Sequence, residues 1–317
     1  MKVIDQLAKA ESTLFSFEVI PPLKGESIQS IYDGIDPLIE FDPISINVTY
    51  HREEFAYRKM PDGLLKRMTV RKRPGTVGIS AALKFRYGVE PVPHLICGGF
   101  TREETENALI DLDFLGIQNV LALRGDPQQN ERIFVPEPEG HTYALDLIKQ
   151  ISALNNGVYL HEDMKNANPT DFCIGVAGYP EKHFESPNVE FDLLNLKKKI
   201  DAGADYIVTQ LFYDNQRFFE FERRCREMGI SVPIIPGIKI LSTKRHLNFL
   251  PSYFHTTLPE DLSRAVLACN DNKEVREVGI EWATAQCREL REHGVPCIHF
   301  YTMGRSYATR RVAEAIY

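Results

Sequence analysis

Polar and charged side chains recur in this sequence where short apolar runs end. Glu18 stands in FSFEVIPP, Thr49 follows the second run and His94 lies within the third. The later runs are followed by Arg124, Gly125 and Asp126, then by Tyr179, Gln210 and Tyr301. A carboxyl group, a guanidinium fork, an amide and phenols at one place could move a proton and hold a polar ligand.

Glu18 is the first candidate for acid chemistry. Its neighbours are Phe17, Val19 and Ile20, so partial desolvation would favour the neutral acid and let it donate a proton near neutral pH. The alternative from the residues alone is a strand-end carboxylate that pairs with a nearby Arg or Lys.

LALRGDP at 121–127 joins a fork donor, a permissive glycine and a carboxylate in three residues. The tripeptide could help to bind a ligand. For the tripeptide alone, the favoured explanation is a turn with an internal ion pair between Arg124 and Asp126.

FDLLNLKKKIDAGAD predicts a helix that carries a polar stripe beside its apolar one. Asp192, Asn195 and Lys199 fall at i, i+3 and i+7, so these groups could hold a phosphorylated ligand near the helix start. The alternative is an ordinary solvated face with i,i+4 ion pairs, to which Lys197 is assigned.

The histidines and cysteines predict no metal site. His94 in an apolar strand is typical of a hydrogen-bonded core residue, and His183 in GYPEKH is weak on its own. The six cysteines are scattered without zinc-ligand spacing, so we expect reduced thiols that serve mostly as packing groups.

The elements that would position these residues alternate between strand and helix. Strands are predicted at 14–20, 43–49, 92–97, 117–123, 172–177, 205–209, 232–238 and 296–300. Helices are predicted at about 27–40, 76–88, 101–115, 141–155, 190–203, 214–228, 242–250 and 304–316, with further helix at 259–292. Eight alternations predict an α/β protein with a single (β/α)8 barrel over 1–317, whose site lies at the carboxyl ends of its strands. The rival doubly wound sheet, in its dinucleotide-binding form, would need a GxGxxG motif, and the sequence has none.

The composition of the chain excludes some classes of binding partner. A net charge of -7, with 37 basic and 44 acidic residues, argues against nucleic acid or a polybasic membrane anchor and favours a small-molecule partner. The amino terminus lacks the apolar core of a signal peptide, and no apolar run approaches the roughly 18 residues of a membrane span. We therefore expect a soluble, cytoplasmic protein.

Two segments stand outside the strand-and-helix pattern. The loop 125–140 is long for a βα connection, which makes it a candidate active-site loop. The segment 52–73 is rich in Lys and Arg and is interpreted as a solvated loop and helix face.

The motifs FSFEVIPP, NVTY, PHLIC, LALRGDP, AGYPEKH, DLLNLKKKIDAGAD, VTQLFYD, PIIPGI and HFYT, taken in order, resemble the methylenetetrahydrofolate reductase family across nearly the whole chain. The resemblance implies a catalytic barrel that binds FAD. It implies flavin contacts from Thr49, His94, Leu123, Arg124, Gly125, Asp126, Tyr143, Ala144, Ala177, Tyr179, His183, Asp192, Asn195, Lys198 and Lys199. Glu18, Asp126, Gln210, Tyr301 and Arg305 match the folate-side positions. For the segment 52–73, a role in holding cofactor phosphates or the folate glutamate tail is the alternative to a solvated face.

The implied reaction is flavin-dependent reduction of 5,10-methylenetetrahydrofolate to 5-methyltetrahydrofolate with NADH or NADPH, by ping-pong turnover at one flavin face. Opening the methylene bridge requires a proton on nitrogen, for which Glu18 is the chosen acid. Asp126 would stabilise the cationic iminium, and Gln210 would hold either substrate through its amide. No Rossmann ribose discriminator exists from which the electron donor could be read.

The resemblance also implies further properties and leaves rivals open. We expect a homo-oligomer, and no response to S-adenosylmethionine, because the last predicted helix would close the barrel. The runner-up is a barrel lyase or aldolase that acts on a phosphorylated substrate through Lys198 or Lys199 and Glu18. A third reading is a folate- or nucleotide-binding barrel without turnover, since a fold alone never fixes a function.

Overall fold

A computed structural model describes residues 1–127, 131, 133–161 and 167–317. Its main sheet consists of parallel strands in the order β10, β11, β1, β2, β5, β6, β7, β8, β9. The bounds are β1 (Leu14–Val19), β2 (Ser45–Val48), β5 (Glu90–Ile96), β6 (Asn119–Leu123), β7 (Cys173–Gly178), β8 (Tyr206–Thr209), β9 (Ile234–Ile235), β10 (Gly237–Ile238) and β11 (Cys297–Tyr301).

The sheet closes on itself at Pro236. Pro236 separates β9, which pairs with β8, from β10, which pairs with β11. The Pro236 carbonyl accepts a hydrogen bond from the His299 amide at 2.9 Å, so the two short strands occupy one position of the ring. The predicted (β/α)8 barrel is confirmed, with all eight predicted strands at their expected places.

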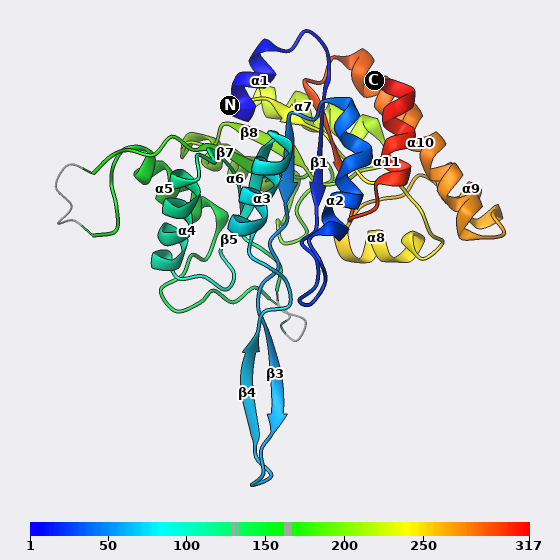
Figure 1. The fold of residues 1–317 in the computed structure, drawn as a ribbon. Helices are drawn as coiled ribbons and strands as arrows, with labels where there is room; N and C mark the ends of the chain where they lie inside the picture. The colour runs from blue at the N-terminus through cyan, green and yellow to red at the C-terminus, as the bar shows by residue number, and fades with distance from the viewer. Residues whose placement is uncertain (128–130, 132, 162–166) are drawn as a thin grey trace.

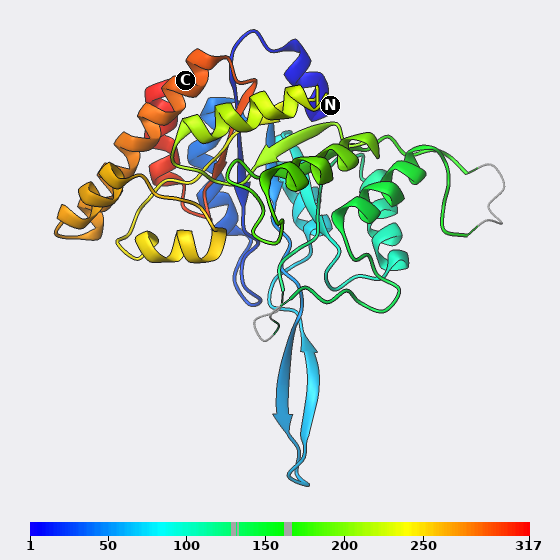
Figure 2. The same cartoon turned by 180° about the vertical axis from the view of Figure 1, so that it is seen from behind.

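Helices surround the ring, as Figures 1 and 2 show from two sides. They are α2 (Gln29–Ile35) with the 3-10 turn η1 (Asp36–Phe41), α3 (Thr76–Tyr87), α4 (Arg102–Phe114), α5 (Ala144–Asn155), α6 (Val189–Asp201), α7 (Asn215–Glu227), α8 (His246–Phe254), α9 (Glu260–Ala268), α10 (Asn272–His293) and α11 (Ser306–Ile316). Local signals fix their ends. Thr101 and Glu104 form a reciprocal capping box at the start of α4, and Gly294, at φ 87°, ends α10. The further helix predicted at 259–292 is interrupted, giving α9 and α10.

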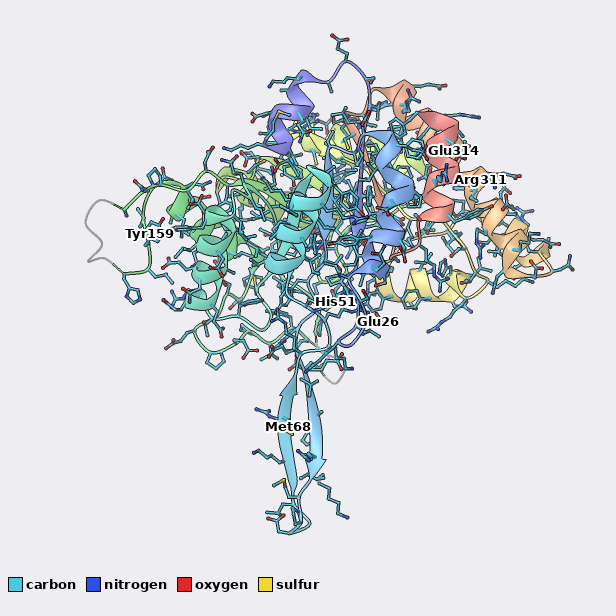
Figure 3. All side chains as sticks on the ribbon, viewed as in Figure 1. Glu26, His51, Met68, Tyr159, Arg311 and Glu314 are labelled. Atoms are coloured by element: carbon cyan, nitrogen blue, oxygen red, sulfur yellow. The ribbon has the colours of Figure 1, made fainter. Side chains whose placement is uncertain are left out.

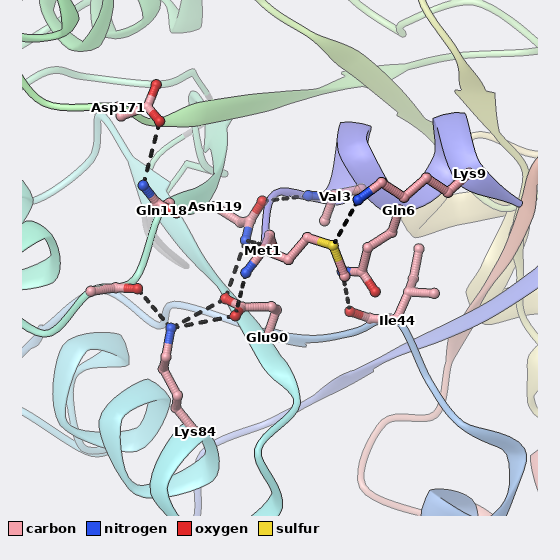
Figure 4. A network of polar contacts seen from close by, with 11 residues as sticks. Met1, Val3, Gln6, Lys9, Ile44, Lys84, Glu90, Gln118, Asn119 and Asp171 are labelled. Carbon is pink, nitrogen blue, oxygen red and sulfur yellow. Dashed lines mark hydrogen bonds and ion pairs between the residues drawn. The ribbon is translucent and has the colours of Figure 1, made fainter.

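The amino-terminal end of the barrel is apolar and covered by α1 (Val3–Lys9), a seven-residue helix that the sequence patterns did not predict. Val3 and Leu7 pack with Val92, Leu121 and Tyr206 inside the ring. Figure 4 shows the polar contacts that hold the segment: the Val3 amide donates to Asn119 Oδ1 at 2.7 Å, and the Met1 ammonium pairs with Glu90 at 2.7 Å. These contacts fix α1 as a cover over this end.

The larger core lies between the strands and the helices, where Phe15, Phe17 and Phe300 pack with their ring centroids 5.4–5.6 Å apart around Phe15. All six cysteines are buried, unpaired thiols within the three apolar clusters. Burial raises the pKa of Cys97, Cys173, Cys225 and Cys297 to about 12. The prediction that they serve as packing groups is therefore confirmed.

The interpretation of 52–73 as a solvated loop and helix face is wrong. The segment forms an antiparallel hairpin of β3 (Glu54–Lys59) and β4 (Leu65–Val70) that extends away from the barrel at the end opposite α1 (Figures 1 and 2). Asp62 and Gly63 make the turn, with Gly63 at φ 85°. Charged residues on both faces of the strands obscure the alternation that marks a strand.

Among the described residues, no helix is long and apolar enough to cross a membrane.

Candidate functional site

A cavity of about 1950 Å³ opens at the carboxyl ends of the barrel strands. Its volume exceeds the roughly 300–1,000 Å³ of a typical small-ligand site, so more than one ligand has room there. Every site residue predicted from the sequence lines it: Glu18, Thr49, His94, Leu123, Arg124, Gly125, Asp126, Tyr143, Ala144, Ala177, Tyr179, His183, Asp192, Asn195, Lys198, Lys199, Gln210, Tyr301 and Arg305.

Glu18 is the penultimate residue of β1, and its side chain is almost fully buried. Desolvation raises its pKa to about 7, against the opposing positive charge of Lys239. Its backbone carbonyl accepts a hydrogen bond from Thr302 Oγ1 at 2.6 Å, which fixes the strand end. The carboxyl is therefore a group that exchanges its proton near neutral pH.

Lys239 is a cavity residue that sequence reasoning missed. It follows β10 directly, and its ammonium donates to the Tyr301 carbonyl at 2.9 Å. Burial lowers its pKa to about 8, partly offset by Glu18. The signal was available, because Lys239 is the first polar residue after the PIIPGI run, at a strand's carboxyl end.

Two histidines inside the ring are held neutral. Burial lowers the pKa of both His94 and His299 to about 3. His94 Nε2 lies 3.4 Å from Asn47 Nδ2, and His299 Nδ1 lies 3.0 Å from Ser16 Oγ. His94 is thus both a hydrogen-bonded core residue and a lining residue of the cavity. His299, on β11, had no signal beyond its place in an apolar strand.

Arg124 pairs outside its own turn. Its Nη1 binds Glu185 Oε2 at 2.5 Å, and its guanidinium lies 5.2 Å from the Phe134 ring centroid. The prediction of an internal ion pair between Arg124 and Asp126 is therefore wrong. Gly125 takes φ 86°, which favours glycine, and a Cβ there would make a tight contact with Ile96 at 3.3 Å.

Asp126 turns instead toward α8, where its Oδ2 accepts a hydrogen bond from Tyr253 OH at 3.3 Å. Residues 128–130 and 132 of the candidate active-site loop 125–140 lie outside the described residues. Asp126, Pro127 and Glu131 of the same loop line the cavity.

The polar stripe of α6 faces the cavity as predicted. Asp192 accepts hydrogen bonds from Ser186 Oγ at 2.8 Å and from the His183 amide at 3.1 Å. Lys199 donates to the Ala177 carbonyl at 3.1 Å, and burial lowers its pKa to about 8. Lys197 pairs with Asp201 on the outer face, which confirms its assignment to a solvated face.

The remaining predicted residues take different positions around the opening. Tyr301 donates its hydroxyl to the Thr209 carbonyl at 2.6 Å, which leaves its ring as the surface toward a ligand. The Gln210 side-chain oxygen accepts from the Leu211 amide at 2.9 Å. Tyr143, at the start of α5, is exposed at the rim. Thr49 Oγ1 lies 3.2 Å from His51 Nε2, beside the base of the hairpin, where Figure 3 labels His51.

The fold and the site together define a (β/α)8-barrel protein whose large cavity, lined by both acids and cations, lies at the carboxyl ends of the strands. The family description "Methylenetetrahydrofolate reductase" matches residues 3–317. The chain belongs to the methylenetetrahydrofolate reductase family.

Relatives of two lengths agree with this assignment. The chain is 32% identical to the 5,10-methylenetetrahydrofolate reductase of Salmonella typhimurium, covering 95% of this chain and 90% of the relative. It is 34% identical to Methylenetetrahydrofolate reductase (NADH) 1 of Arabidopsis thaliana, covering 96% of this chain and 48% of the relative. The chain therefore spans about half the length of its plant relatives and nearly the whole length of the bacterial one.

A solved structure shares the fold at low sequence identity. It is an uncharacterized protein from Clostridium thermocellum that binds two copies of 5-methyl-5,6,7,8-tetrahydrofolic acid. The two chains are 14% identical and superpose with a TM-score of 0.56, covering 98% of this chain and 96% of the other. At that identity, the likeness concerns the fold alone.

Proposed function

We propose that this protein reduces 5,10-methylenetetrahydrofolate to 5-methyltetrahydrofolate with electrons from NADH or NADPH, passed through FAD. The observation that carries the proposal is a buried carboxyl, Glu18, whose pKa of about 7 suits proton donation, at the cavity of a methylenetetrahydrofolate reductase family member.

The donor set of the cavity fits FAD. The pyrophosphate of a dinucleotide needs cations, and Arg124, Lys198 and Lys199 line one side of the cavity. The open space of about 1950 Å³ also leaves room for a second reactant. When bound, FAD would supply the hydride chemistry, while the protein supplies orientation, proton delivery and electrostatics.

Glu18 would deliver the proton that opens the methylene bridge. The leaving nitrogen becomes protonated, the bridge carbon becomes an electrophilic iminium, and the carboxyl becomes a carboxylate. Lys239 follows β10, two strands from β1, and lines the same cavity as Glu18, so its positive charge would help to stabilise the carboxylate that forms. Gln210 and the ring of Tyr301 would hold the pterin beside this acid.

Asp126 would act on the positive charge that develops on the substrate. Its carboxylate lies at the end of β6, beside the positions assigned to flavin, and would stabilise the cationic iminium. Because nicotinamide and folate would use one flavin face, they would bind alternately, which gives ping-pong turnover. We further propose that the assigned cofactor contacts and the folate-side residues act as the sequence resemblance implies.

The lyase or aldolase alternative has one supporting feature and one opposing feature. The lowered pKa of Lys199 is what an amine nucleophile needs, but its ammonium already donates to the Ala177 carbonyl beside Asp192. The family membership favours the reductase.

The experiment is the visible spectrum of the purified protein, reconstituted with FAD and followed anaerobically. The expected result is a flavin spectrum that bleaches on addition of NADH or NADPH and returns on addition of methylenetetrahydrofolate. A protein that binds no flavin after reconstitution contradicts the proposal. Bleaching without reoxidation by the folate would leave a flavoprotein with another substrate.

A further inference from the structure

The hairpin of β3 and β4 leaves large apolar side chains uncovered. Leu64 and Leu65 at its tip are 69% and 65% exposed, and Tyr57 along β3 is 64% exposed. Met68, labelled in Figure 3 on β4, is also exposed. Because Tyr57 and Met68 lie on opposite faces of the pair, neither face of the hairpin is buried. A two-stranded hairpin without a covered face is marginally stable in water, so a partner surface is expected.

The base of the hairpin is anchored to the barrel. Lys72 forms an ion pair with Glu54 across the strands, and Arg73 donates to the Pro21 carbonyl. The Lys24 amide donates to the Lys72 carbonyl at 2.7 Å. The hairpin is therefore held at its base and presents its far half away from its own barrel (Figures 1 and 2).

The charge of this segment is opposite to that of the remaining chain. Residues 52–73 contain eight Lys and Arg against three Asp and Glu, a net charge of +5 in a chain of -7. The rest of the chain therefore carries -12. The remainder of a second copy thus has the opposite net charge, and each copy would both give and receive a hairpin, as a closed two-fold assembly requires.

We propose that the far half of the hairpin, residues 57–67, docks on the acidic body of a second copy of this chain. Cations on both faces, Arg58 and Lys66 on one and Lys59 on the other, would meet carboxylates of the partner. The leucines at the tip favour a protein surface over an anionic substrate tail, because a tail would use cations beside the cavity and leave the tip exposed.

The test is light scattering coupled to size-exclusion chromatography at micromolar concentration. Wild type is expected to be a dimer or larger, and Arg58→Glu with Lys66→Glu, or Leu64→Ser with Leu65→Ser, is expected to weaken assembly at least about tenfold. Lys9→Glu with Lys149→Glu, on exposed positions outside the hairpin, is the matched control for charge. Circular dichroism checks that each variant is folded.

Two results would overturn this proposal. One is a monomeric wild type, and the other is hairpin variants that assemble as well as wild type and the control. In the latter case, a raised KM for substrates with longer anionic tails would assign the hairpin to the substrate instead. The light-scattering measurement tests assembly without the proposed reductase activity, so the two claims can fail separately.

A separate observation concerns Lys239. Glu18 and Tyr301 are register partners on β1 and β11, and Lys239 extends from the adjacent β10 to the Tyr301 carbonyl at 2.9 Å. β11 lies between β10 and β1, so this backbone contact holds the lysine at the residue that pairs with the acid. Other groups near the pair are Arg305 and His246, both on the Lys239 side, and Tyr301 itself.

We infer that Lys239 is a positioning residue that sets the pH range in which Glu18 acts as an acid. This inference rests on the proposed function. Burial raises the pKa of Glu18 and the ammonium of Lys239 lowers it, so removal of the ammonium should raise the pKa of Glu18 further. The acid would then stay protonated to higher pH, but would donate less readily once protonated.

The measurement is the pH profile of flavin reoxidation by methylenetetrahydrofolate in stopped flow. In Lys239→Met, the fall of this rate at high pH should move upward by at least about one pH unit. Lys239→Arg should restore most of the wild-type profile, which a purely steric role would not predict. An unmoved profile in the methionine variant overturns the inference. If wild type shows no folate reduction, the carboxyl of Glu18 can still be titrated by infrared difference spectra against Glu18→Gln, so the two claims fail separately.

Discussion

The two ends of the barrel use the same strands in opposite ways. At the amino-terminal end, Val92, Leu121 and Tyr206 point inward under a helical cover and are almost fully buried. At the carboxyl end, Glu18 and Lys239 are buried as ionisable groups with pKa values moved toward neutrality. Burial of apolar groups stabilises the fold, whereas burial of these charges costs stability. Apolar packing at the amino-terminal end therefore offsets the free-energy cost of burying Glu18 and Lys239 at the carboxyl end.

The largest expected effect is a loss of catalysis in a protein that remains folded. Glu18→Gln keeps the shape of the side chain but cannot donate a proton, so flavin reoxidation by methylenetetrahydrofolate should fall about 10²–10⁴-fold. Flavin bleaching by NADH should stay near the wild-type rate, because that step needs no acid. Two stopped-flow half-reactions measure this. A near-normal reoxidation rate would show that Glu18 is not the acid, and collapse of both steps with loss of FAD would show that it holds the site together.

The same substitution, Glu18→Gln, should change how the free energy of unfolding depends on pH. The pKa of Glu18 is about 7 when folded and near the ordinary 4.5 when unfolded, so the penalty on folding grows as the pH rises from 4.5 to 7 and is complete above 7. The advantage of Glu18→Gln over wild type in the free energy of unfolding should thus be about 2–3 kcal/mol larger at pH 8 than at pH 5. Urea denaturation at the two pH values measures it. An advantage that is equal at both would mean that Glu18 is solvated.

At the other end, Leu7→Ala should break stability and spare the chemistry. Leu7 is 8% exposed and packs into the apolar end of the ring, so its truncation should cost about 2 kcal/mol. Urea denaturation gives the free energy of unfolding, and the two half-reactions of the folded protein should match wild type. A changed rate of either half-reaction would mean that the two ends are coupled.

The smallest expected effect lies at the carboxyl end. Asp126→Asn should bind FAD and slow folate reduction about tenfold more than nicotinamide oxidation, because only the folate step develops a cation beside this carboxylate. Tyr253→Phe is the matched control, since it removes the hydrogen bond to Asp126 but keeps the charge. Equal slowing of both half-reactions would contradict the role given to Asp126.

Much of the fold and cavity could be predicted because both follow from one rule. Strand ends of a parallel barrel converge, so the polar residues after each apolar run gather whatever their distance in sequence. The partners could not be predicted in this way: Arg124 reaches Glu185 and Asp126 reaches Tyr253, over 61 and 127 residues of chain. Lys239 and the hairpin did leave signals, a polar residue after PIIPGI and an Asp62-Gly63 turn, and only the turn was obscured by charged surroundings.

The six buried thiols have a consequence for how the molecule can be observed. A thiol reacts with alkylating reagents only as an accessible thiolate, and burial in the apolar clusters keeps the reagent away from all six thiols. Cys173 and Cys297 lie at the amino-terminal end of the ring, Cys97 and Cys225 in the outer core, and Cys269 near α9 and α10. Each thiol should therefore be labelled only as fast as its own region opens. The order in which the cysteines become alkylated would read out, region by region, the order in which the native barrel comes apart.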